Sequence, residues 1–208
     1  AIIPYVPKKV RVSMKQGLGP ACKCSMKVGA KVTQGRKISK SLHDLSASVH
    51  APVTGVVTAV TDDYCEIEVE SCDLLFPDDP HYQAIQENVS FSNEEIVKKM
   101  KEGGIVGMGG AGFPCALKYA ATAPIHTVII NGAECEPYLT CDEHLMNEMG
   151  YAVLNGALLM KKAVGASRLI FCLENNKKAV LDHLRSLAGG FEYEMDFCLL
   201  PTKYPQGG

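Results

Sequence analysis

The stretch GIVGMGGAGFPCALKY, residues 104–119, decides how the second half of this chain is interpreted. Five glycines stand among its first nine residues, Gly103 precedes it directly, and a proline and a lysine follow. Each fixed glycine costs conformational entropy, so we expect such a cluster where positive φ is required or where side chains would collide with a ligand. A phosphate held against bare backbone N–H groups meets both conditions, whereas a tight turn needs only one or two glycines. The segment therefore predicts a ligand loop.

A helix is predicted on each side of this loop. Residues 92–104, SNEEIVKKMKEGG, carry Ser92 as N-cap, Glu95 as its capping-box partner, lysines in the last turn and glycine at the end. Pro114 suits the first turn of a second helix, over about residues 114–121, because its missing N–H would be unpaired there in any case.

The rest of the chain alternates between predicted strands and helices. Helices over about residues 141–164, with Gly165 as C-cap, and 176–188 separate three strands: HTVIIN (126–131), RLIFCL (168–173) and MDFCLL (195–200). This order predicts a parallel sheet with crossover helices, whose ligands lie outside the carboxyl ends of the strands. Asn131 ends one strand, and Glu174 and Asn175 end the next. We therefore expect the acidic loop GAECEPY (132–138) and the glycine loop to face one crevice.

The first ninety residues have a different pattern. Short apolar runs alternate with turn signals there, which predicts a small all-β unit. The proline-containing stretch LLFPDDPHY (74–82) follows, so we place a boundary near residue 90, between domains 1–90 and 91–208.

Two phrases of this β unit, MKVGAKVTQGRKI (26–38) and VHAPVTGVVTAV (49–60), resemble the barrel-sandwich hybrid of biotinyl and lipoyl carrier domains. A working carrier needs a lysine at a hairpin tip between the two halves. Asp44 and Leu45 stand at that place, and Lys40 comes several residues too early. We therefore expect no lipoyl or biotinyl attachment and interpret the module as a structural or docking unit.

Composition excludes several classes of protein. A chain of 208 residues with 47% hydrophobic and 21% charged residues is globular, and a net charge of −2 gives no basic surface for nucleic acid. No stretch approaches the ~18 apolar residues of a transmembrane helix. Nine cysteines without a C-x-x-C motif are typical of a reducing, cytoplasmic compartment. Cys135, Cys141 and His144 come nearest to a metal cluster, and we interpret them as unligated, with no metal site.

A dinucleotide fingerprint is a second interpretation of the glycine loop. Gly107, Gly109 and Gly112 satisfy G-x-G-x-x-G, and Glu134 lies near the distance of a ribose-binding acid. Such a fingerprint must follow a strand, however, and this one follows a capped helix. The spacing alone is therefore weak evidence.

The longer string is specific. GMGGAGFPCALKY (107–119), followed by INGAECEPYLTCDEHLM (130–146), resembles the flavin-binding subunit of NADH:quinone oxidoreductases and, more closely, the C-subunit of the Rnf electron-transport complexes. The amino-terminal β module and the closing KYPQGG (203–208) match the same Rnf protein in the same order. The resemblance implies a mixed fold of α/β plus small all-β type: a barrel-sandwich hybrid followed by a Rossmann-like α/β flavin-binding domain, truncated at its carboxyl end.

The resemblance also implies a site for FMN and NAD(H) with no catalytic side chain. Phe113 would stack on the adenine, Lys118 would lie near the flavin phosphate, and Glu136 would line the nicotinamide side. Asn131 and Glu134 would hydrogen-bond the ribityl chain or ring edge of the flavin. Tyr138 stands where the flavin-binding subunit of NADH:quinone oxidoreductases, whose motif is here called the respiratory motif, has glycine. The larger side chain would narrow the nucleotide pocket relative to that subunit. The remaining expected contacts are the backbone at Gly107, Gly109, Gly110, Ala111 and Gly112, and the side chains of Glu174, Asn175 and Asn176.

The function implied is that of an electron-transfer subunit in a membrane-associated, ion-translocating oxidoreductase complex. NADH would reduce flavin, and electrons would continue to 4Fe–4S clusters in a missing carboxyl-terminal part, so this fragment alone is expected to be inactive. Partners would be the other subunits of the complex. The chain would lie in the cytoplasm, peripheral to the membrane and without direct insertion. Two alternatives stay open: a soluble NADH-linked protein that serves proline reductase, and a docking or scaffold module that has lost flavin.

Overall fold

The structure, a computed structural model, describes residues 5–73, 90–108, 112–120, 123–134, 136, 138–190 and 195–206. The chain divides into two compact units, one of residues 1–74 with 95–120 and one of residues 75–94 with 121–208. The first unit therefore includes the described part of the glycine-rich segment together with the β module. The domain boundary near residue 90 stays a prediction.

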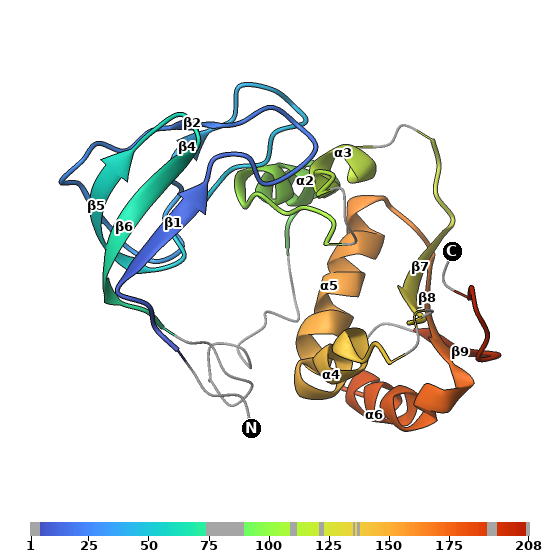
Figure 1. Cartoon of the computed structure of the whole chain (residues 1–208). Coiled ribbons are helices and arrows are strands. Elements are labelled where there is room, and N and C mark those ends of the chain that lie inside the picture. Colours follow the sequence, from blue (N-terminus) through green and yellow to red (C-terminus); the bar gives the residue numbers. More distant parts are fainter. Residues whose placement is uncertain are drawn as a thin grey trace. The chain divides into compact units, whose positions relative to one another are not determined.

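The β module consists of two antiparallel sheets around one core. A larger sheet has the strand order β1-β6-β5-β3 and pairs β1 (Lys9–Ser13), β6 (Tyr64–Ser71), β5 (Thr54–Val60) and β3 (Lys31–Val32); β1, β6 and β5 lie side by side in Figure 1. A smaller sheet pairs β2 (Lys23–Cys24) with β4 (Ser39–Lys40). Alternate residues of the strands, such as Val12, Val57 and Ile67, face inward, and the core also contains Met14 and Ile38 from the connecting segments. The predicted small all-β unit is confirmed.

Two helices flank the glycine-rich segment, as predicted. α2 (Asn93–Glu102) begins directly after Ser92, and a backbone N–H of Glu94 and the Ser92 hydroxyl both lower the pKa of the Glu94 carboxyl. α3 (Cys115–Tyr119) is shorter than the predicted 114–121, because Pro114 has an extended ψ of 120° and stands at the N-cap.

The second unit contains a parallel sheet of order β7-β8-β9, formed by β7 (Thr127–Gly132), β8 (Arg168–Glu174) and β9 (Asp196–Leu200). Helices α4 (Cys141–Glu148), α5 (Gly150–Ala163) and α6 (Lys178–Ala188) connect the strands and lie together on one side of the sheet (Figure 1). Their core contains Leu154, Leu169, Phe171 and Leu181, whereas Ile129 on the other sheet face is 61% exposed. The predicted alternation of strands and helices is confirmed.

One long helix over residues 141–164 was predicted, and this prediction is wrong. The segment forms α4 and α5, separated at Met149, whose φ of −127° and ψ of 33° are not helical. Close packing accompanies the break, because a Cβ on Gly150 would lie 2.5 Å from Leu187 Cδ1 of α6. The predicted C-cap is confirmed, since Gly165 has a φ of +65° and donates to the Lys162 carbonyl.

The start of α6 also differs slightly from the prediction. A short 3-10 turn, η1 (Asn175–Lys177), comes between β8 and the helix.

Within the described residues, no helix has both the length and the apolar character that crossing a bilayer requires.

Candidate functional site

The base of the glycine-rich loop is closed by main-chain hydrogen bonds. Gly107 N–H donates to the Phe113 carbonyl at 2.9 Å, and Cys115 N–H donates to the Ile105 carbonyl at 3.0 Å. These bonds belong to an antiparallel bridge between Val106 and Pro114. Gly107 and Phe113 therefore lie side by side next to the start of α3.

Three of the predicted site residues come together at this base. Lys118 Nζ lies 5.7 Å from the centre of the Phe113 ring. The same ammonium is 3.3 Å from the position that a Cβ would take on Gly107. Because Gly107 has no Cβ, the positive charge of Lys118 lies close to the main chain here. Gly109, Gly110 and Ala111, also predicted for the site, lie outside the described residues.

Two other glycines of the cluster have packing reasons that the sequence did not reveal. Gly104 has a φ of +66°, and a Cβ there would lie 2.1 Å from the Ser48 carbonyl oxygen. Gly112 has a φ of +60°, and its Cβ would lie 3.0 Å from the Gln16 carbonyl oxygen. Both glycines allow the segment to approach the backbone of the β module. The role predicted for Gly112 at a cofactor stays a prediction.

In the second unit, the carboxyl ends of β7 and β8 share one edge of the sheet. The parallel register pairs Asn131 with Cys172 and Gly132 with Leu173, so Asn131 and the buried Glu174 lie near that edge, as the sequence predicted. Asn131 Oδ1 accepts a hydrogen bond from Ala133 N–H at 3.1 Å, which turns the chain out of the strand.

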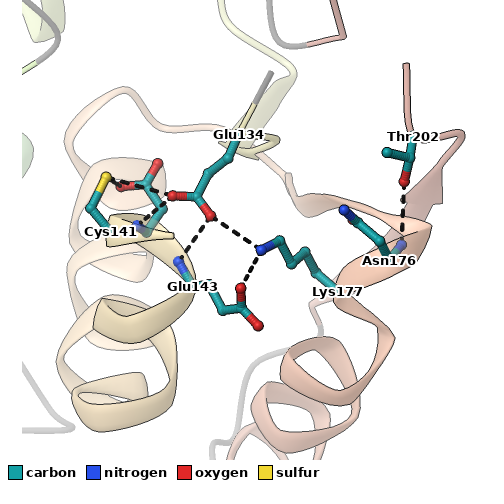
Figure 2. Close-up of polar contacts among 7 residues, drawn as sticks. Glu134, Cys141, Glu143, Asn176, Lys177 and Thr202 are labelled. Carbon is teal, nitrogen blue, oxygen red and sulfur yellow. Dashed lines mark hydrogen bonds and ion pairs between the residues drawn. The ribbon is translucent and has the colours of Figure 1, made fainter. Parts of the chain in front are cut away.

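The predicted asparagines after β8 contact the segment after β9. Asn175 Oδ1 accepts from the Thr202 hydroxyl at 2.6 Å. Figure 2 shows the second contact, in which Asn176 N–H donates to the Thr202 hydroxyl oxygen at 3.4 Å. Both asparagines are exposed. Their contacts fix the two strand ends relative to each other.

The carboxylate of Glu134 caps a helix that its own residues leave uncapped. Thr140 occupies the N-cap position of α4 without a side-chain cap bond. Glu134 instead accepts from Asp142 N–H at 2.9 Å and from Glu143 N–H at 3.4 Å, with its side chain only 3% exposed (Figure 2). The amides at a helix N-terminus favour a negative charge, so Glu134 holds the acidic loop against α4.

Lys177 joins this arrangement from the other strand end. Its ammonium lies 3.7 Å from Glu134 Oε2 and forms a hydrogen-bonded ion pair with Glu143 (Figure 2). The Lys177 side chain is 11% exposed. The hydrogen bond with Glu143, aided by the charges of both carboxylates, raises the pKa of Lys177 against the opposing effect of desolvation. Glu134 therefore has both oxygens engaged, and its predicted flavin contact stays a prediction.

Possible metal-ligand atoms also gather here. Atoms of Glu134, Cys141 and Asp142 lie within 4.8 Å of one another, and the Cys141 thiol donates to Glu134 Oε1 at 3.5 Å. The oxygens of Glu134 already accept from the amides of α4, so helix capping accounts for the grouping. Cys135, which the sequence placed in the nearest approach to a metal cluster, lies outside the described residues.

The tip of the acidic loop is open to solvent. Glu136 is exposed, and Tyr138 is fully exposed with a φ of 66°. That φ lies in the left-handed region that favours glycine, the residue that the respiratory motif has at this place. The loop thus keeps a glycine-like backbone while presenting an aromatic ring.

Sequence reasoning missed Lys177, Glu143 and the capping role of Glu134. A usable signal was present, because a glutamate follows β7 and a lysine follows β8 at similar distances from their ends. The carboxyl ends of neighbouring parallel strands meet, so opposite charges at these places predict an ion pair.

Two models of known protein families match different parts of the chain. Residues 3–73 match the family model described as RnfC Barrel sandwich hybrid domain, and residues 100–208 match that of the Nuo51 FMN-binding domain. The barrel-sandwich hybrid expected from the sequence is thereby confirmed; the Rossmann-like detail of the second part is not.

Curated relatives match over nearly the whole chain. The chain is 33% identical to the C-subunit of the ion-translocating oxidoreductase complex of Pectobacterium carotovorum subsp. carotovorum, over 98% of this chain and 28% of that protein. It is 34% identical to the protein of the same name from Rhodobacter capsulatus, over 97% of this chain and 41% of that protein. The chain therefore spans well under half the length of these relatives.

A solved structure of an NAD+-reducing NiFe hydrogenase in the H2-reduced state aligns with 58% of this chain and 24% of its own chain, at 23% identity and a TM-score of 0.47. A score at this level carries no argument about fold or function. The family models and the curated relatives suffice for the assignment: the chain belongs to the Nuo51 FMN-binding domain family, in a form that carries an RnfC barrel-sandwich hybrid domain ahead of that domain.

Proposed function

We propose that this chain is the FMN-binding part of an NADH-linked electron-transfer subunit in an ion-translocating oxidoreductase complex. Support comes from the FMN-binding family match over residues 100–208 and from relatives that are named as the C-subunit of such complexes. The other subunits would be its partners, and the chain would lie in the cytoplasm at the membrane surface. Clusters of 4Fe–4S type stay a prediction for a part of the protein beyond these residues.

The main support for the proposal is the positively charged site that Lys118, Gly107 and Phe113 form at the base of the glycine-rich loop. Lys118 holds its ammonium over the ring of Phe113 and close to the backbone of Gly107, which carries no side chain of its own. A phosphate needs such a positive charge together with backbone that it can approach closely. The residues present therefore fit the phosphate end of FMN.

The other predicted residues are proposed as nucleotide contacts without a specified geometry. Phe113 would stack on the adenine of NADH, Asn131 would hydrogen-bond the flavin, and Glu136, exposed on the acidic loop, would line the nicotinamide side. FMN, when bound, supplies the redox chemistry by accepting a hydride and releasing its electrons singly. The chain's own residues bind and orient, and no general base is required. Further proposed contacts are Gly109, Gly110, Ala111, Gly112, Glu174, Asn175 and Asn176.

A comparison of FMN with riboflavin tests whether this positively charged site binds the phosphate. We expect Lys118→Ala to weaken FMN binding by roughly 10- to 100-fold, the effect of losing a charged hydrogen bond of about 1.5–3 kcal/mol. Riboflavin lacks the phosphate, so its affinity should not change. Lys98→Ala, which removes an exposed lysine of α2, is the matched control. Equal losses for FMN and riboflavin in Lys118→Ala would contradict the assignment.

A second experiment separates the electron-transfer function from the scaffold alternative. The full-length protein is purified anaerobically, and its visible absorbance is recorded before and after NADH. Flavin bands that bleach with NADH support the proposal. A colourless protein that does not respond to NADH, even after incubation with FMN, supports the scaffold. The relatives' names favour a component of a complex over a soluble partner of proline reductase.

A further inference from the structure

The first unit contains an open groove that the proposed function does not use. Its volume is about 730 Å³, within the ~300–1,000 Å³ typical of ligand sites. One wall is the loop that follows β4, and the other is the carboxyl-terminal half of α2. The residues that line it are Lys37, Lys40, Ser41, Leu42, His43, Asp44, Ser48, Lys98, Lys101 and Glu102.

The groove carries an excess of positive charge. Of its four lysines, Lys101 pairs with Asp44 at 2.7 Å and Lys98 lies 4.0 Å from Glu102. Lys37 and Lys40 have no ion pair within the described part of the chain, and both are exposed. Two positive charges thus remain available in a chain whose net charge is −2.

The loop wall is held in one conformation by its own hydrogen bonds. The Ser41 hydroxyl contacts the carbonyl oxygens of His43 at 2.7 Å and Ser46 at 2.9 Å, and Leu45 N–H donates to His43 Nδ1 at 3.1 Å. Despite this order, Leu42 is 71% exposed. An ordered loop that presents an exposed apolar side chain, beside two lysines without an ion pair among the described residues, is a preorganised surface, which lowers the entropy cost of binding.

We propose that this groove binds an acidic peptide segment of a partner protein, with an apolar side chain of that segment packed on Leu42. Charge complementarity with Lys37 and Lys40 argues for acidic side chains. The groove is larger than one phosphate requires, and the described residues that line it include no phenylalanine, tyrosine or tryptophan to stack on a nucleotide base. Leu42 favours a peptide over an inorganic anion. The inference concerns a site separate from the proposed FMN contacts.

The test uses the whole 208-residue chain and a fluorescein-labelled peptide of repeating Glu-Asp-Leu, with a Gln-Asn-Leu peptide as the neutral control. Fluorescence anisotropy at several salt concentrations measures affinity. We expect the double variant Lys37→Gln/Lys40→Gln to bind the acidic peptide roughly tenfold more weakly, as two lost surface ion pairs imply, with a shallower salt dependence. The matched control is Lys27→Gln/Lys31→Gln, which removes two exposed lysines of the same module outside the groove.

Leu42→Ser separates a peptide site from an anion site. We expect it to weaken peptide binding severalfold without changing the salt dependence, and circular dichroism confirms that each variant is folded. Equal losses in the two lysine double variants overturn the proposal, because binding then follows net charge alone. Failure of the acidic peptide to bind overturns it as well. An unchanged affinity in Leu42→Ser, with inorganic pyrophosphate displacing the peptide efficiently, identifies a phosphate site instead.

Discussion

The two loops that the sequence predicts to face one crevice are stabilised by different kinds of contact. The base of the glycine-rich loop is held by main-chain contacts: Gly107 N–H donates to the Phe113 carbonyl, and Gly104 lies against the Ser48 carbonyl. The acidic loop is fixed by charge, with Glu134 placed between the amides of α4 and the ammonium of Lys177. The contact at Gly104 is possible because glycine has no Cβ. The contacts of Glu134 depend on the charges of its carboxylate and of the Lys177 ammonium.

This difference predicts different sensitivities. A contact between main-chain atoms leaves no room for a Cβ and responds little to pH or salt. A buried ion pair loses its stabilisation when one partner is removed or neutralised, so its contribution depends on pH. Substitutions in the two loops should therefore show distinct thermodynamic behaviour.

The largest expected effect is that of Gly104→Ala. Its Cβ would lie 2.1 Å from a main-chain oxygen that has no flexible end to move, at a φ of +66°. We expect a loss of more than about 3 kcal/mol in the free energy of unfolding, measured by urea denaturation with circular dichroism. Gly29→Ala is the matched control, because Gly29 has a φ of +85° with open space around it. That variant should cost only about 1 kcal/mol. Equal losses of unfolding free energy in the two variants would mean that the positive φ, and not the contact with Ser48, is the reason for glycine at position 104.

The next effect concerns the acidic loop. Lys177→Met leaves Glu134 and Glu143 without their common cation, and we expect a loss of about 2–3 kcal/mol in unfolding free energy. Lys178→Met removes the neighbouring lysine, whose pair with Asp182 is exposed, and should change stability by less than ~0.5 kcal/mol. Similar results for the two variants would show that the Lys177 cluster acts as an ordinary surface pair.

The pH dependence of stability sharpens the same comparison. The pKa of Lys177 is raised above its ordinary value of 10.5, so its contribution is complete below that pH and is lost as pH rises further. Wild-type protein should therefore lose stability at alkaline pH more steeply than Lys177→Met. Parallel curves for the two proteins would contradict this origin.

A smaller effect is expected for the exposed ion cluster of the β module. Glu66 accepts from Arg11 Nε at 2.9 Å and from the Thr58 hydroxyl at 2.8 Å, and it pairs with Lys9. These contacts lower the pKa of Glu66 from 4.5 to about 2. Its stabilisation is present above pH 4.5 and is lost as pH falls toward 2. Glu66→Gln should therefore flatten the loss of stability over this range in acid unfolding curves. An unchanged slope would exclude Glu66 as its source.

The fold was largely predictable because its elements are local. The residue patterns predicted the β module, α2 and the parallel sheet, with errors at the ends of two helices and at one helix break. One such error is the break at Met149, where Gly150 packs against Leu187 of α6. Helical periodicity continues across this point in the sequence, so the pattern gives no sign of the interruption.

The candidate site was predictable only in part. The sequence indicated that Phe113 and Lys118 follow the glycines, and they do meet at the loop base. It did not indicate that Gly104 and Gly112 contact the β module, because such contacts join segments far apart in sequence. Nor did it assign Lys177, whose role depends on the register of β7 with β8. Long-range contacts of this kind leave no periodic signal.

Gly107→Ala should have the smallest effect on stability and the most informative effect on binding. The nearest atoms to its Cβ would be Lys118 Nζ at 3.3 Å, at the end of a flexible side chain, and the Phe113 carbonyl oxygen at 3.8 Å. We therefore expect a change of less than about 1 kcal/mol in unfolding free energy. If a phosphate lies against this backbone, the added methyl displaces it, and FMN affinity should fall by at least about tenfold while riboflavin affinity changes little. Unchanged FMN affinity in this variant would mean that the glycines serve packing alone, and the two loops would then differ in function as well as in the forces that hold them.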